Sequence, residues 1–180
     1  MAAYIGLLRG VNVAGHNLVS MGDLRGFLSR LGFEEPRTLL QSGNVVFNAK
    51  STSAAALEKL LESEAKKKLG MEISFFVRTP DEWKLLIAGN PFPREAKNDP
   101  ARLVAVPLKN APPPAAVHSL VEAIPGRETV RVIGNTAYIY YPDGQGTSKL
   151  TNALIESKLG TRGTARNWNT VLKLAALAAT

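Results

Sequence analysis

The sequence repeats one order of predicted strands and helices, and this order limits the possible folds more than any other feature. Each half contains a predicted strand, helix, strand, strand and helix, with a Gly-Asn turn between the middle strands at Gly43-Asn44 and Gly134-Asn135. This order fits an antiparallel sheet with helices on one face, the split βαβ arrangement of a ferredoxin-like domain. We therefore expect an α+β fold of two ferredoxin-like lobes from an internal duplication, followed by a C-terminal helix.

The first half of the chain has the clearest helix and strand signals. Ser20 is a good helix N-cap and Gly32 supplies a left-handed stop, so a helix is expected between them. Thr79, with Glu82 three residues later, predicts a capping box at the start of a short helix. Strands are expected at 4–8, 37–41, 45–47 and 73–77, and a second helix at 53–69.

The second half repeats this order less completely. Strands are expected at 102–108, 128–133 and 137–141, and helices at 113–123, 148–159 and 167–178. Where a last strand should lie, the chain has only the polar segment "TRGTAR". The Pro-, Gly- and charge-rich segment 89–101 predicts a linker between an N-terminal lobe, 1–88, and a C-terminal lobe, 102–180.

Charge and composition narrow the class of partner. The chain has 22 Lys and Arg against 15 Asp and Glu, a formal net charge of +7, which favours acidic partners such as phosphorylated metabolites or nucleic acid. It has no cysteine and only two histidines, so we expect no disulfide, metal or cofactor. No apolar run approaches the roughly 20 residues of a membrane span, and the N-terminal residues indicate a first strand, so we expect a cytoplasmic protein.

A long polar loop follows the first strand, within "LLRGVNVAGHNLVSMGDL" at residues 7–24. Arg9 ends the strand, and Asn12 and Asn17 tolerate left-handed backbone. Loops beside a rigid strand often carry ligand contacts, so these three residues are candidates for binding. Alternatively, the asparagines satisfy the amides of the loop itself and Arg9 pairs with a carboxylate. We expect this loop to be ordered without a ligand, because a buried strand and a well-capped helix flank it.

The segment "PDGQGTSKL", residues 142–150, is a second candidate. Ser148 and Lys149 precede a predicted helix, whose free amides can bind an anion. The glycine spacing differs from that of a phosphate-binding P-loop. The alternative is a turn in which Thr147 or Ser148 caps the helix.

The segment "TARNWNTVLKL", residues 164–174, is a third candidate. Arg166 lies just before a predicted helix N-terminus, which favours anions, and Asn167 or Asn169 caps that helix. Few acidic residues lie nearby in the sequence. We therefore expect Arg166→Ala to cost at most about 1 kcal/mol of stability, as at a surface position, and to weaken anion binding by more.

No catalytic signature accompanies these candidates. The two histidines are not part of a recognisable Ser-His-Asp arrangement, and no dinucleotide-binding glycine pattern or RNA-recognition aromatic motif is present. Catalytic residues are therefore unassigned, and whether the protein is an enzyme stays open.

Three groups of motifs extend over essentially the whole chain: "YIGLLRGVNVAGHNLVSMGDLRGFLSRLGF…RTLLQSGNVVF", "VRTPDEW…NPFP" and "GTSKLTN…LG…TARNWNTVLKL". Together they resemble the bacterial family known as domain of unknown function 1697. The resemblance implies a two-lobed α+β protein built from ferredoxin-like units, and it implies no particular activity. The family usually has Gly-Gly-Lys-Asn where this chain has Ala14-Gly15-His16-Asn17, so a lysine role at this position does not carry over to His16.

Our leading hypothesis is a protein that binds, or binds and acts on, a phosphorylated or other anionic small ligand between the lobes. An arginine would bind the anion through two hydrogen bonds, and side-chain amides would orient it. One alternative is a nucleic-acid-binding module with a basic face, and another is a structural or oligomerisation protein. The candidate ligand-binding residues are Arg9, Asn12, Asn17, Ser148, Lys149, Arg166 and Asn167.

Overall fold

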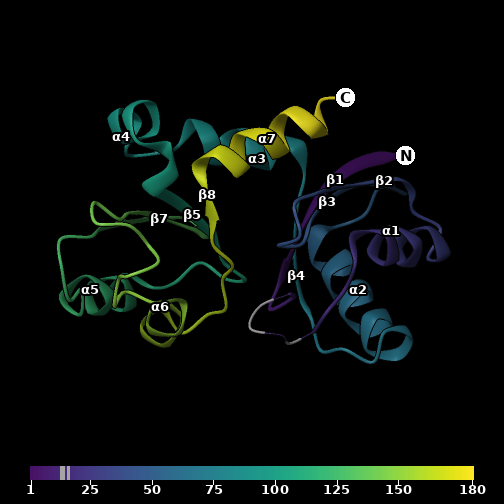
Figure 1. Ribbon diagram of the computed structural model, residues 1–180, viewed down its shortest axis with the longest axis horizontal. Helices are drawn as coiled ribbons and strands as arrows, with labels where there is room; N and C mark the ends of the chain where they lie inside the picture. The colour runs from purple at the N-terminus through teal and green to yellow at the C-terminus, as the bar shows by residue number, and fades with distance from the viewer. Residues whose placement is uncertain (13–14, 16) are drawn as a thin grey trace. The chain divides into compact units, whose positions relative to one another are not determined.

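The computed structural model describes residues 1–12, 15 and 17–180. The chain divides into two compact units (Figure 1). Unit 1 contains Met1–Leu85 together with Leu174–Thr180, and unit 2 contains Leu86–Lys173. Each unit is an α+β domain with one four-stranded antiparallel sheet, so the fold is the expected pair of ferredoxin-like units.

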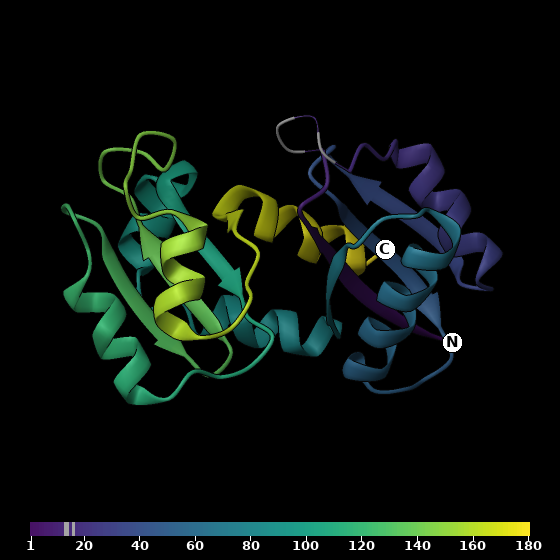
Figure 2. The ribbon, with the colours of Figure 1, turned by 90° about the horizontal axis from the view of Figure 1, so that it is seen from below.

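Unit 1 has the strand order β2-β3-β1-β4. Helices α1 and α2 pack on one face of this sheet and enclose its core, which includes Leu8, Phe27, Phe47 and Phe75 (Figures 1 and 2). The elements are β1 (Ala2–Arg9), α1 (Met21–Arg30), β2 (Glu34–Leu39), β3 (Asn44–Ala49), α2 (Ala54–Lys68), β4 (Ser74–Arg78) and α3 (Pro80–Ala88).

The helix boundaries of unit 1 follow the capping signals of the sequence. The Ser20 hydroxyl accepts a hydrogen bond from the Asp23 amide at 3.0 Å, and Gly32 after α1 adopts φ +86°. At α3, the Thr79 amide donates to the Glu82 carboxylate at 2.8 Å and the Glu82 amide donates to the Thr79 hydroxyl at 3.1 Å. The expected capping box is therefore confirmed.

Unit 2 has the matching strand order β6-β7-β5-β8. Helices α5 and α6 lie on one side of this sheet over a core that includes Val106, Leu120, Ile139 and Ile155 (Figures 1 and 2). The elements are α4 (Pro93–Asn98), the 3₁₀ helix η1 (Pro100–Arg102), β5 (Leu103–Pro107), α5 (Pro114–Glu122), β6 (Thr129–Ile133), β7 (Thr136–Tyr140), α6 (Asn152–Leu159), β8 (Arg166–Asn167) and the start of α7 (Trp168–Ala178), whose residues from Leu174 onward belong to unit 1.

The two sheets also agree in register. Ile5 of β1 lies opposite Arg78 of β4, and Ala105 of β5 lies opposite Arg166 of β8. Three residues after each of these positions, a leucine amide donates to the turn between the middle strands: Leu8 to the Gly43 carbonyl at 2.9 Å and Leu108 to the Asn135 carbonyl at 2.8 Å. An internal duplication predicts this shared register.

The fourth strand of unit 2 lies in the segment that seemed to lack one. Arg166 and Asn167 pair with β5, and Gly163 forms an isolated bridge with Leu108 in the same register. A strand of this composition has no apolar alternation to reveal it. Gly163 permits its close approach to β5, because a Cβ there would lie 2.8 Å from side-chain atoms of Leu108 and Val106.

Two expectations about local structure in unit 2 are corrected. The predicted linker 89–101 contains α4 and most of η1. Helix α6 starts at Asn152 rather than at 148, because Thr151 is the N-cap and accepts from the Leu154 amide at 3.3 Å. Ser148 cannot serve as that cap, since its hydroxyl is bound elsewhere, as described below.

Candidate functional site

One face of unit 2 carries basic side chains along β8 and along the paired segments that adjoin β5 and β8. Val104, Val106, Leu108 and Ala165 pack toward α5 and α6. Because side chains alternate along paired strands, the residues between them face the other side of the sheet. Four polar residues of this other face, three of them basic, form what we call the basic row. They are Lys109, Arg162, Thr164 and Arg166.

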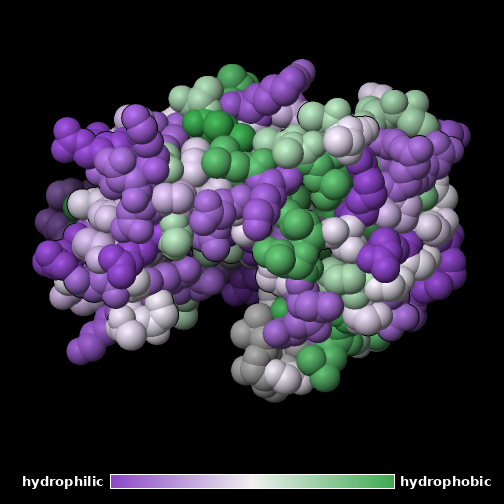
Figure 3. All heavy atoms as spheres, turned by 45° about the horizontal axis from the view of Figure 1, so that its top comes forward, coloured by the Kyte–Doolittle hydropathy of each residue, from purple (hydrophilic) through white to green (hydrophobic). Residues whose placement is uncertain are grey.

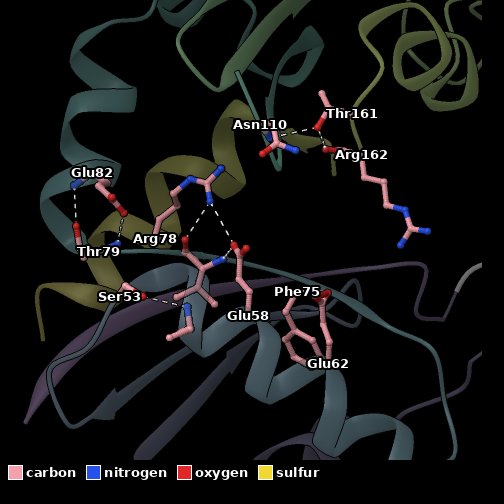
Figure 4. Close-up of polar contacts among 12 residues, drawn as sticks. Ser53, Glu58, Glu62, Phe75, Arg78, Thr79, Glu82, Asn110, Thr161 and Arg162 are labelled. Atoms are coloured by element: carbon pink, nitrogen blue, oxygen red, sulfur yellow. Dashed lines mark hydrogen bonds and ion pairs between the residues drawn. The ribbon is translucent and has the colours of Figure 1, made fainter. Parts of the chain in front are cut away.

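Hydrogen bonds fix the backbone of the basic row. The Lys109 amide donates to the Arg162 carbonyl at 2.9 Å, and the Thr164 amide donates to the Pro107 carbonyl at 3.1 Å. The Asn110 amide donates to the Thr161 hydroxyl at 3.1 Å. Figure 4 shows the Arg162 side chain extending away from Asn110 and Thr161. At this end of the row, hydrogen bonds hold the backbone in place, and the side chain of Arg162 is exposed.

Arg166 lies at the buried end of the row. It is 7% exposed, and its Nη1 donates to the Thr164 hydroxyl at 2.7 Å and to the Ala165 carbonyl at 2.8 Å. Burial lowers the pKa of Arg166 to about 10, because the charged guanidinium loses hydration. The expectation that Arg166 behaves as a surface residue is therefore wrong, and its removal should cost more than about 1 kcal/mol.

Asn167 links the row to α7. Its side-chain oxygen accepts from the Thr170 amide at 3.1 Å, so Asn167 is the helix cap, as one of the two sequence alternatives proposed. The side chain of Asn167 is otherwise exposed. The first turn of α7, which the structure describes completely, contains no acidic residue.

Unit 1 contains a related arginine at the corresponding position of its fourth strand. Arg78 is buried, and its Nη1 donates to the Val77 carbonyl at 3.0 Å, as Arg166 does to its own preceding carbonyl. Burial lowers the pKa of Arg78, while the charges of Glu58 and Glu82 raise it. Glu58 lies 3.6 Å from the Arg78 guanidinium, which points toward it in Figure 4. Unit 1 thus supplies its own carboxylates beside this buried cation.

The loop after β1 is braced by its asparagines. The Asn12 side chain donates to the Val19 carbonyl at 2.9 Å and to the Gln41 carbonyl at 2.7 Å, and it accepts from the Val19 amide at 2.9 Å. The Asn17 side chain donates to the Gly10 carbonyl at 3.1 Å. Both asparagines have positive φ, 55° and 46°. These contacts favour the alternative in which they stabilise the loop.

Arg9 is the third candidate binding residue of this region. Arg9 is half-buried at the end of β1, opposite Ser74 of β4. His16 lies outside the described residues, as do Val13 and Ala14.

Ser148 lies beside a carboxylate. Its hydroxyl donates to Glu128 Oε1 at 2.5 Å and accepts from the Leu150 amide at 3.0 Å. Lys149 next to it is exposed. A hydroxyl that already donates to a carboxylate is poorly suited to an anion. The candidate binding residues of unit 2 therefore form two separate pairs. Ser148 and Lys149 lie near Glu128, and Arg166 and Asn167 lie in β8.

The net positive charge is larger in unit 2 than in unit 1, because unit 2 has fewer acidic residues. Eleven basic and six acidic residues lie in Leu86–Lys173, whereas unit 1 has eleven and nine. Figure 3 shows hydrophilic residues over most of the visible surface of unit 2, on the left of the view. Among the described residues, no helix combines the length and the apolar character that a membrane crossing requires.

Comparison with known proteins agrees with this fold. The conserved bacterial protein SP0830 from Streptococcus pneumoniae is similar in structure, with a TM-score of 0.76, 22% sequence identity and 98% of each chain covered. No curated protein matches the chain significantly. The family model described as "Protein of unknown function (DUF1697)" matches residues 1–138. The chain therefore belongs to the DUF1697 family.

Proposed function

We propose that the protein binds a phosphorylated or other anionic small molecule on the basic row of unit 2. The observation that carries this proposal is the shared face of Lys109, Arg162 and Arg166 on two adjacent, hydrogen-bonded segments. Three cations on one face of a sheet create a positive potential that attracts anions.

The three cations have different parts in the proposed site. Arg162 is exposed and offers the planar guanidinium that binds phosphate or carboxylate through two hydrogen bonds. Lys109, directly across the ladder, adds a point charge. Arg166 is too buried to touch a ligand, and it contributes through its charge. Burial disfavours the charged form of Arg166 and lowers its pKa. A bound anion would stabilise this charge and raise the pKa again, so the charge of Arg166 favours binding.

Asn167 pairs with Val104, so it lies on the opposite face of the sheet from the basic row and does not contact an anion bound there. Its side chain is exposed and its oxygen is held by the α7 amide, so the orientation of its amide group is fixed. The neutral first turn of α7 does not repel an anion, whereas the first turn of α3 carries Asp81 and Glu82. This contrast favours unit 2 over unit 1 for anion binding.

Nucleic acid is the second candidate ligand, because the charge excess of unit 2 also favours a polyanion. The salt dependence of binding separates the two. A nucleic acid that contacts several phosphates loses affinity steeply with salt, with a slope that rises with the number of contacts. A small anion on the row involves fewer contacts and gives a shallower slope.

The proposal is tested by a thermal-shift screen of inorganic phosphate, pyrophosphate, nucleotides and sugar phosphates, followed by titration calorimetry of the compounds that stabilise the protein. Arg162→Ala is the test variant and Lys67→Ala, an exposed lysine of α2, is the control. We expect Arg162→Ala to weaken binding by roughly 10- to 100-fold, since a charge-assisted hydrogen bond contributes about 1.5–3 kcal/mol. Equal affinity in both variants would refute the proposed site.

A further inference from the structure

Unit 2 contains an open pocket between α5 and β6 that the basic row does not use. Its volume is about 580 Å³. Apolar side chains form most of its wall: Phe92, Val117, Val121, Ile124, Val130 and Val132. The exposed fraction of Val121 is 45%, so this wall includes apolar surface that faces solvent. Apolar pockets with a few polar groups are the usual form of small-molecule sites.

Glu128 is the acidic residue in the wall of this pocket. Its Oε1 accepts a hydrogen bond from the Ser148 hydroxyl. Its Oε2 is buried and has no hydrogen-bond partner among the described residues. A buried carboxylate oxygen without a donor carries a desolvation cost. This oxygen therefore favours a group that brings an N–H donor or a positive charge.

The surroundings of Glu128 hold its carboxylate in place. Gly126 lies against it, because a Cβ on Gly126 would be 2.7 Å from Glu128 Oε2. The Tyr141 hydroxyl donates to the Leu150 carbonyl at 3.0 Å, on the same segment as Ser148. Burial, together with the negative charge of Glu128, raises the pKa of Tyr141 to about 12. The carboxylate is thus fixed by one hydroxyl and confined by a glycine turn.

We propose that this pocket binds a small organic cation, in which an ammonium or amidinium group on an apolar body pairs with Glu128. The apolar body would cover Val121 and Ile124, and the charged group would lie beside the Glu128 carboxylate, where its positive charge compensates the buried Oε2. An ammonium ion brings both a charge and several N–H donors to one carboxylate.

The other charges near the pocket are compatible with a cationic ligand. Arg131 also lines the pocket, but it is exposed on β6, where water screens its charge. Arg127, next to Glu128, pairs with Asp143 through two hydrogen bonds. Glu128 therefore sets the charge preference of the buried part of the pocket.

The test compares three probes with the same apolar body: cyclohexylmethylamine, cyclohexylmethanol and cyclohexanecarboxylate. Binding is measured by NMR titration of the protein, residues 1–180, at pH 7. We expect the amine to bind roughly 10-fold or more tightly than the alcohol, and the carboxylate to bind most weakly. The shifted amide signals should lie in α5 and β6, while phosphate binding at the basic row stays unchanged.

Glu128→Gln and Glu122→Gln form the matched pair of variants. Glu122 also lies on the α5 side of unit 2, but it is an exposed residue that pairs with His118. We expect Glu128→Gln to remove the preference for the amine over the alcohol, and Glu122→Gln to retain it. Should Glu128→Gln fail to fold, Val121→Arg at the exposed rim provides the test, because its charge should weaken amine binding at least several-fold.

Two results would overturn the inference. One is a carboxylate probe that binds as tightly as the amine. The other is an amine affinity that is unchanged in Glu128→Gln, or in Val121→Arg if the first variant does not fold. Both results are independent of phosphate binding by Arg162, so the two proposals fail separately.

Discussion

The turn between β2 and β3 provides a sharp test of the packing in unit 1. Gly43 has φ +84°, and its carbonyl accepts the Leu8 amide at 2.9 Å. A Cβ at this position would lie 2.8 Å from both Leu8 Cβ and Val11 Cγ2. Leu8 and Val11 are 1% and 2% exposed, so neither can turn outward to make room.

Gly43→Ala should therefore destabilise unit 1 through two separate effects. The left-handed backbone costs a residue with a Cβ about 1–2 kcal/mol. Forcing a methyl group against two buried side chains costs about 1–3 kcal/mol more. We expect a total loss of about 2–5 kcal/mol.

Gly134→Ala is the matched control in the corresponding turn of unit 2. Gly134 also has a positive φ, 58°, but among the described residues no heavy atom outside its own neighbourhood lies within 4 Å of the added Cβ. Only the backbone cost of about 1–2 kcal/mol should remain. Urea unfolding followed by NMR resolves the two units, because each contains one tryptophan, Trp83 or Trp168. Equal losses in the two variants would refute this reasoning.

Three further predictions concern the loop, a helix cap and alkaline pH. Asn12→Ala should cost about 2–4 kcal/mol in urea unfolding, because it removes three side-chain hydrogen bonds, whereas Asn17→Ala removes one and should cost about 1 kcal/mol. Thr79→Ala should cost about 1 kcal/mol through loss of the capping box, seen as a lower urea midpoint. Burial raises the pKa of Tyr138 and Tyr141 to about 12, above the ordinary 10.0, so their neutral hydroxyls favour the folded state, and the stability that they contribute should be lost as the pH rises from 10 to 12. A tyrosine absorbance titration with every side chain ionising near pH 10 in the folded protein would contradict the last prediction.

The sequence predicts the fold where local signals and the core agree. Ser20 and Thr79 cap helices in the expected way, because their partners lie only three residues along the chain. The Gly-Asn turns and the apolar strands give the element order of both units. These features depend on short-range backbone geometry and on alternation of apolar residues, which a single sequence displays directly.

The fourth strand of unit 2 could not be predicted in this way. Its residues are paired through backbone hydrogen bonds to β5, while its side chains are mostly polar or small. Arg162, in the segment that leads into β8, and Arg166 of β8 fall on one face only because the register is fixed by that pairing. The sequence identified Arg166 but not its burial, since burial depends on how the second face of the sheet is covered.

The contact of Ser148 with Glu128 could not be predicted from the sequence either. The segment before α6 has the residues of an anion-binding loop, but its hydroxyl meets Glu128, which lies 20 residues earlier in the chain. That contact depends on the tertiary fold and has no local signature. The same contact leaves one oxygen of Glu128 without a donor, and this oxygen is the basis of the proposed cation site.

The most direct test of the proposed function is an NMR titration of the protein with pyrophosphate. We predict that the largest shifts of backbone amide signals fall on residues 162–167 and on Lys109, and that they vanish in Arg162→Ala. Shifts confined to the exposed lysine run at Lys66–Lys68, or shifts unchanged in Arg162→Ala, would contradict the assignment of anion binding to the basic row.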